Sequence, residues 1–152
     1  VVGNVAAGRG GLRELATRVI QRFQVQSGGP EAAARSLSGG NLQKFIVGRE
    51  IDARPRVLVV SQPTWGVDVG AAALIRNELL QLRQAGCAVL VVSEELDELF
   101  EISDRLMVIA KGRVSPAVPA SQMTVERVGL WMSGLWTQEA LPAQEEAAHA
   151  PA

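Results

Sequence analysis

Two short apolar runs constrain the fold more than any other feature of this sequence. Val57–Val60 and Ala88–Val92 consist of Val, Leu and Ala, without the alternation of polar and apolar residues that marks a strand with one wet face. Such runs are typical of parallel strands covered on both faces. A helix is expected between them over 71–85, with Gly86 just past its end. We therefore expect the α/β fold class with a mainly parallel sheet.

Further elements are expected on both sides of this unit. Apolar residues recur at helical spacing over 12–23 and 41–51. A short acidic helix is expected over 96–102, a third buried strand over 106–109, and a hairpin-like turn at 111–113. From Gln138 on the sequence contains almost no large apolar side chain, so we expect a disordered tail over 135–152, with the only histidine, His149, inside it as a solvated spectator.

Composition excludes several classes of protein. The longest apolar run, Cys87–Val92, is far shorter than the roughly 20 residues of a membrane-spanning helix. A single cysteine excludes an internal disulfide and a cysteine-based metal cluster. Residues 1–56 carry nine basic and four acidic side chains, whereas the rest carries six and twelve. The basic half could face phosphate, nucleic acid or an acidic partner, or its arginines could simply solvate helices.

Ser38, Gly39 and Gly40 stand directly before a predicted helix. The first turn of a helix presents unpaired N–H groups and about half a positive charge, and glycines let a phosphate approach those groups closely. Serine and glycine are also common at helix starts for purely structural reasons, because a serine oxygen caps a free N–H group. The three residues therefore indicate either a phosphate site or an ordinary helix cap.

The longer pattern around these residues is more specific. Leu37–Lys44 is followed by an apolar helix, a polar loop, the strand Val57–Val60 and the string Gln62–Gly70. This order and spacing resemble the nucleotide-binding domain of ABC transporters, with Leu37–Lys44 similar to its signature motif. Gly66–Asp68 resembles the D-loop of that family, and Val91–Glu94 resembles its switch-histidine region.

Four further features look most like the second ATP-binding half of importers of simple sugars and nucleosides. They are Asn41 after the two glycines, the Gln-Pro-Thr string at 62–64, the Asp-Val-Gly-Ala string at 68–71, and Gly129–Gly134. The resemblance implies a partial P-loop NTPase-like core with part of a helical subdomain. Residues 1–51 would be the helical portion, ending in the signature helix. Residues 52–134 would be the distal half of the α/β ATPase core.

The resemblance also implies a function and partners. ABC domains work as head-to-tail pairs, so Ser38, Gly39, Gly40 and Asn41 would contact ATP bound by a partner half, which would also hold most of the Mg²⁺ coordination. The expected partners are that second half, membrane permease subunits and, indirectly, a solute-binding protein, with no nucleic acid. The expected place is cytoplasmic, peripheral to the inner face of the plasma membrane.

The departures from the family pattern concern the catalytic positions. Ser61 and Gln62 stand where the family has a Mg²⁺-holding Asp and a catalytic Glu, and Glu94 stands at the switch histidine. A serine hydroxyl is a poor Mg²⁺ ligand and an amide accepts no proton at neutral pH, so we expect a non-hydrolytic site here and no metal ligands. Asp68 would couple the two ATP sites or merely cap the next helix. Trp65 replaces the usual arginine of this subfamily.

The phosphate loop and the Q-loop of the family have no match in this sequence. The stretch Gly8–Gly11 is glycine-rich but has neither the lysine nor the following hydroxyl of a P-loop, so the isolated chain is expected to be inactive. Two alternatives to the importer remain at this point. One is an ABC-type ATPase of DNA repair or translation, and the other is a non-catalytic remnant or binding module.

Overall fold

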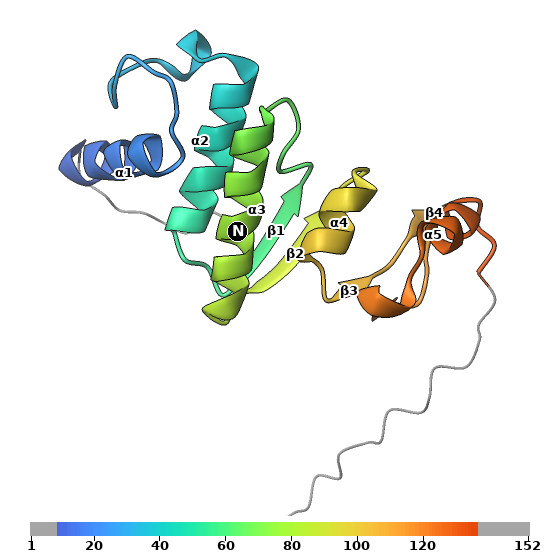
Figure 1. Ribbon diagram of the computed structural model, residues 1–152. Helices are drawn as coiled ribbons and strands as arrows, with labels where there is room; N and C mark the ends of the chain where they lie inside the picture. The colour runs from blue at the N-terminus through green and yellow to red at the C-terminus, as the bar shows by residue number, and fades with distance from the viewer. Residues whose placement is uncertain (1–8, 137–152) are drawn as a thin grey trace, which may run out of the picture. The chain divides into compact units, whose positions relative to one another are not determined.

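The computed structural model describes residues 9–136, which belong to two compact units divided after Ile102 (Figure 1). The elements of the first unit are α1 (Arg9–Arg22), η1 (Ala34–Ser36), α2 (Gly39–Asp52), β1 (Val57–Ser61), α3 (Val69–Gln84), β2 (Ala88–Val92) and α4 (Leu96–Ile102). Those of the second unit are β3 (Arg105–Leu106), β4 (Ile109–Ala110), β5 (Arg113–Val114), β6 (Val118–Pro119), η2 (Ala120–Gln122) and α5 (Val125–Met132).

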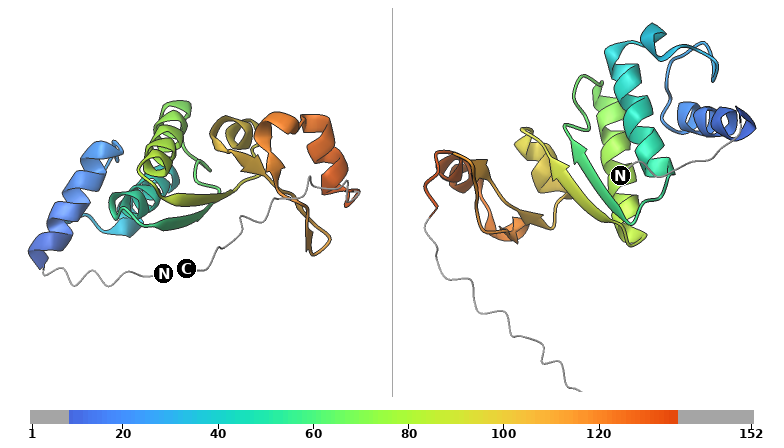
Figure 2. Two further views of the ribbon diagram at one scale, coloured as in Figure 1. Left: turned by 90° about the horizontal axis from the view of Figure 1, so that it is seen from below. Right: turned by 180° about the vertical axis from the view of Figure 1, so that it is seen from behind.

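The two apolar runs form the parallel pair of strands that the sequence predicts. Val57 of β1 lies opposite Ala88 of β2, and the register continues to Ser61 opposite Val92. Helix α3 connects the strands, as a crossover between parallel neighbours must. Helices α2 and α3 pack against each other and against the strands (Figures 1 and 2). The α/β class with a parallel sheet is therefore confirmed.

The second face of this sheet corrects one expectation. The strands were expected to be buried on both faces, but Val57 and Val59 are each 65% exposed, and Leu90 and Val92 are 46% and 42% exposed. Successive side chains of a strand point to opposite faces, so these four residues share the face turned away from α2 and α3. Within the described part of the first unit, nothing covers that face.

The core of the first unit lies where α1, α2 and α3 meet the covered face of the strands. Phe23, just past the end of α1, is fully buried. Its ring lies directly on Gly48 of α2, where an added Cβ would be only 2.5 Å from Phe23 Cδ2. Only glycine lets α2 approach the ring so closely. The buried apolar residues of this core are Val19, Phe23, Val25, Val47, Ile51, Leu58, Ile75, Leu79, Leu82, Cys87 and Ile102.

The helices expected in this unit are confirmed, although three of them begin two or three residues earlier than their apolar periodicity indicates. The reason is that a helix starts directly after its capping residue, whether or not the first residues are apolar. Ser38 caps α2 and Asp68 caps α3, each through its side-chain oxygen. Gly86, with φ of +93°, follows the last turn of α3 as expected.

The third strand expected over 106–109 is wrong as a strand of the parallel sheet. Leu106 of β3 pairs with Val118 of β6, and Ile109 of β4 pairs with Val114 of β5, both antiparallel. The cause is the turn at Lys111 and Gly112, whose φ values of +51° and +71° match the twist of a tight hairpin. The chain therefore folds back on itself, and the hairpin expected at 111–113 is confirmed.

Two expectations about organisation stay predictions. The boundary after residue 51 stays a prediction, and in the described structure α2, β1 and α3 lie together in the first unit. The tail expected from residue 135, with His149, lies outside the described residues apart from 135 and 136. Among the helices that the structure describes, none is both long and apolar enough to cross a membrane.

Candidate functional site

The start of α2 is held by a small polar network. The Ser38 oxygen accepts from the Asn41 backbone N–H at 3.4 Å and from the Asn41 side-chain amide at 2.9 Å. The Asn41 side-chain oxygen accepts in turn from the Gln26 N–H at 2.9 Å. Both acceptor positions of the Ser38 hydroxyl are therefore used, and no described residue accepts its proton, which can be donated to a ligand. The expected cap is confirmed, and it leaves the hydroxyl able to serve a phosphate as well.

The two glycines differ in what surrounds them. A Cβ on Gly40 would lie 2.7 Å from the carbonyl oxygen of Gly66, so this position must be glycine for α2 to contact the loop after β1. A Cβ on Gly39 would meet nothing within 4 Å, and Gly39 is exposed. No packing within the described residues explains glycine at position 39. An open glycine in the first turn of a helix is what close approach by an anion requires.

Two further side chains fasten this helix, and the sequence analysis assigned neither of them a role. Gln43 donates from Nε2 to the carbonyl oxygens of Gln62 at 2.9 Å and Pro63 at 3.1 Å. Lys44 is buried and donates from Nζ to the carbonyl oxygen of Gln24 at 2.9 Å. Their sequence signal was their place at the end of the string Leu37–Lys44, which predicts no contact for either side chain. They hold the start of α2 against the loops that follow β1 and α1.

The residues expected at degenerate catalytic positions, Ser61, Gln62 and Glu94, lie at the carboxyl ends of the two strands. Ser61 ends β1, and the Gln62 N–H donates to the Val92 carbonyl at 2.7 Å. Beyond β2, the Ser93 hydroxyl lies 3.4 Å from the Gln62 side-chain oxygen, and Glu94 follows it, exposed to solvent. This is the edge of a parallel sheet where ligands of α/β proteins bind. Hydroxyls, an amide and one exposed carboxylate occupy it.

Asp68 caps α3. Capping is one of the two roles expected for this residue. Its Oδ1 accepts from the Ala71 N–H at 2.9 Å. That backbone hydrogen bond, assisted by the positive charge of Lys44, lowers the pKa of Asp68 below its usual value of 3.8. Coupling between two ATP sites stays a prediction for this residue.

Replacing Asp68 by Ala should lower the free energy of unfolding by an amount that depends on pH. Because the folded-state pKa of Asp68 is depressed, its stabilising contribution is fully present above the unfolded pKa and is lost as the pH falls through the folded pKa. The free energies of unfolding of wild type and Asp68→Ala, measured with urea, should therefore differ most near neutral pH and become equal in acid. The difference in the free energy of unfolding between Asp68→Asn and Asp68→Ala should not change with pH, since neither side chain titrates. A wild-type difference independent of pH would contradict the capping role.

The sequence of this chain is similar to those of known proteins. The chain is 42% identical over 132 residues to the guanosine import ATP-binding protein NupO of Bacillus subtilis, covering 87% of this chain and 26% of that protein. It is 46% identical over 123 residues to the nucleoside import ATP-binding protein NupA of Lactococcus lactis, covering 81% and 24%. The chain belongs to the ATP-binding protein family of ABC transporters. No family model matches it.

Solved structures of ABC transporter proteins share the fold of this ABC family member. An ATP-binding subunit of an ABC transporter superposes with a TM-score of 0.69 at 12% identity, over 84% of this chain and 56% of that one. A nucleotide-free ATP-binding cassette gives a TM-score of 0.56 at 27% identity, over 70% and 42%. The chain thus spans about a quarter of the length of the curated relatives and about half of the solved cassettes.

The ABC family implies two bound groups, the phosphates of ATP and Mg²⁺, and the residues of this chain fit only the first of them. The start of α2 fits a phosphate, because the open Gly39 and the free proton of Ser38 are together at a helix N-terminus. Ser61 and Gln62 do not fit Mg²⁺, which prefers carboxylate oxygens. Among the described residues there is no group of three or more His, Cys, Asp or Glu that could hold a metal ion.

Proposed function

We propose that this chain is part of the ATP-binding subunit of an importer for simple sugars or nucleosides. In this proposal the start of α2 contacts ATP held by a partner half. The observation that carries the proposal is the exposed Gly39, whose open surroundings have no explanation in the packing of the described residues. The Ser38 hydroxyl and the first N–H groups of α2 would donate to the terminal phosphate. This stabilises developing negative charge without any catalytic side chain.

We further propose that the site formed by this chain's own strand ends does not hydrolyse ATP. Gln62 carries an amide that cannot take a proton from water, and Ser61 offers no carboxylate to Mg²⁺. Glu94 would place a carboxylate near the phosphates, where like charges repel. The Mg²⁺ and the general base would then belong to the partner half, and the assembly would have one hydrolytic site.

The partners follow from the same proposal. The relatives are import proteins by name, which favours an importer over an ABC-type ATPase of DNA repair or translation. An importer ATPase works with membrane permease subunits, and a solute-binding protein acts through them. The protein would then be peripheral to the inner face of the plasma membrane, with the solute chosen by its partners.

The test uses the full-length protein assembled with a complete ATP-binding partner half. Replacing the P-loop lysine of the partner should abolish ATP hydrolysis. Gln62→Asn should change it less than twofold, because it shortens an amide that does no proton chemistry and asparagine tolerates the left-handed backbone at this position, where φ is +49°. A loss of tenfold or more in Gln62→Asn, with the protein still folded, would show that this chain's own site performs the reaction.

A further inference from the structure

Arginines line a hollow at the end of α2 opposite to the Ser38 site. The hollow has a volume of about 620 Å³ and is lined by Arg18, Gln21, Arg22, Asp52 and Arg54. A neighbouring hollow of about 560 Å³ shares Arg22 and Arg54 and adds Arg56 and Glu78 to its lining. At 1.5 Å per residue, the 14 residues of α2 place the hollow roughly 20 Å from Ser38. The proposed contact with ATP therefore does not use it.

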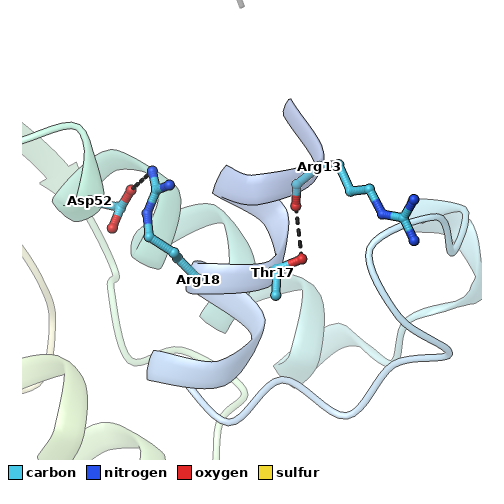
Figure 3. A network of polar contacts seen from close by, with 4 residues as sticks. All are labelled: Arg13, Thr17, Arg18 and Asp52. Atoms are coloured by element: carbon cyan, nitrogen blue, oxygen red, sulfur yellow. Dashed lines mark hydrogen bonds and ion pairs between the residues drawn. The ribbon is translucent and has the colours of Figure 1, made fainter. Parts of the chain in front are cut away.

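The charges in these hollows do not balance. Arg18 pairs with Asp52 at 3.0 Å across the gap between α1 and α2 (Figure 3), and Arg22 forms a two-point ion pair with Glu78. Each guanidinium has five N–H donors, so both arginines keep donors for a further acceptor. Arg54 and Arg56 have no ion-pair or hydrogen-bond partner for their side chains among the described residues.

Four arginines therefore face two carboxylates across the two hollows. The C-terminal ends of α1, α2 and α3 also lie at these hollows, since Ala85 and Gly86 just past α3 line the second one. Each helix end adds roughly half a negative charge, and together they amount to less than the excess of two cations. The two hollows together therefore keep a small positive charge.

Arg54 occupies a backbone conformation that favours a different residue. Its φ is +47°, in the left-handed region directly after the end of α2, where glycine or asparagine is usual. An arginine there is less favourable than glycine. Gln24, Gln62 and Lys111 share this left-handed conformation. Its N–H donates to the Ile51 carbonyl at 3.0 Å, so the backbone turn itself is an ordinary helix end. Glycine would make this turn at a lower cost in free energy.

We propose that this arginine hollow, formed by Arg18, Arg22 and Arg54, binds a phosphate-bearing anion. Guanidinium groups bind phosphate oxygens through paired N–H donors, and three of them around one hollow surround a phosphate from several sides. The hollow is larger than one phosphate, so it accommodates a diphosphate or the phosphodiester headgroup of an anionic lipid. Both sources present the same chemistry to the arginines.

The test compares Arg54→Gly with Arg35→Ala in the full-length protein, with its nucleotide sites filled beforehand by a non-hydrolysable ATP analogue. Both variants remove one positive charge, but Arg35 is exposed in η1, away from the hollow. We expect Arg54→Gly to weaken binding at least fivefold and to leave the melting temperature equal or higher, because glycine adopts this conformation more readily. Arg35→Ala should bind like wild type. Weaker binding together with an equal or higher melting temperature would show that Arg54→Gly removes the site and leaves the fold intact.

Two probes identify the source of the phosphate. Pyrophosphate is titrated by calorimetry, and sedimentation is measured with vesicles of phosphatidylglycerol against vesicles of phosphatidylcholine alone. Pyrophosphate binding that depends on Arg54 supports a soluble phosphate ligand, whereas vesicle binding that depends on Arg54 supports a lipid headgroup. The proposal is overturned if neither probe binds, or if Arg35→Ala weakens binding as much as Arg54→Gly. Because ATP hydrolysis is not the readout, failure here is distinguishable from failure of the proposed importer function.

Discussion

Replacing Ser38 by Asp should lower ATP hydrolysis of the assembled protein about a hundredfold while leaving α2 as stable as before. Aspartate is as good a helix cap as serine, and a negative charge at a helix N-terminus is favourable. The same charge would lie against the terminal phosphate of the partner's ATP. Two like charges about 4 Å apart near a protein surface repel by about 4 kcal/mol, which exceeds the ~2.7 kcal/mol of a hundredfold rate loss. The measurements are steady-state hydrolysis and circular dichroism on the same samples.

Ser38→Asn is the matched control for this prediction. Asparagine also caps a helix and carries no charge, so we expect it to retain far more activity than Ser38→Asp. Equal activity in wild type and Ser38→Asp would show that no phosphate approaches the start of α2. Equal losses in Ser38→Asp and Ser38→Asn would assign the effect to the serine hydroxyl rather than to charge.

The contact between Phe23 and Gly48 should produce the largest effects on folding. Phe23→Ala is expected to lower the free energy of unfolding by about 3–5 kcal/mol, because it removes a fully buried ring and leaves a cavity. Gly48→Ala should lower it by about 1–3 kcal/mol. The added Cβ would lie 2.5–2.9 Å from three ring carbons that are too deeply buried to move aside. Urea unfolding followed by circular dichroism measures both changes.

The double variant tests whether this contact is the cause. With the ring gone, the Cβ at position 48 enters the cavity, and alanine also has a helix propensity better than glycine by about 1 kcal/mol. Gly48→Ala should therefore stabilise the Phe23→Ala protein, although it destabilises the wild type. If the change in the free energy of unfolding of the double variant equals the sum of the two single changes, the close packing of α1 on α2 is contradicted.

The sequence predicts well where α2 begins, and it predicts the contacts around that helix start only in part. The string Leu37–Lys44 places the start of α2, and both the cap and the open glycine are found there. The difference between Gly39 and Gly40 could not be predicted, because it depends on the Gly66 carbonyl, which folding brings close from a distant part of the chain. Gln43 and Lys44 escaped notice for the same reason, since their acceptors lie in other loops.

The fold was predictable where local pattern decides it. The parallel pairing of β1 and β2 follows from two uniformly apolar runs on either side of a helix. The same pattern indicated burial on both faces, but Val57 and Val59 are exposed. An apolar run shows that a strand can be buried on both faces, and it does not show which segments cover those faces. The third strand was misplaced because the left-handed turn at Lys111 and Gly112 gives residues 113–119 local antiparallel partners.

The most direct test of the central claim is whether position 38 touches ATP held by the partner half. Ser38→Cys would be combined with an ATP analogue that carries a thiol-reactive group on its terminal phosphate and is bound to the partner. The native Cys87 is only 7% exposed and should not react. We expect Cys at position 38 to be labelled only when the partner is present, and an exposed control, Gln122→Cys, to stay unlabelled. No partner-dependent label at position 38, or equal labelling of both positions, would contradict the account.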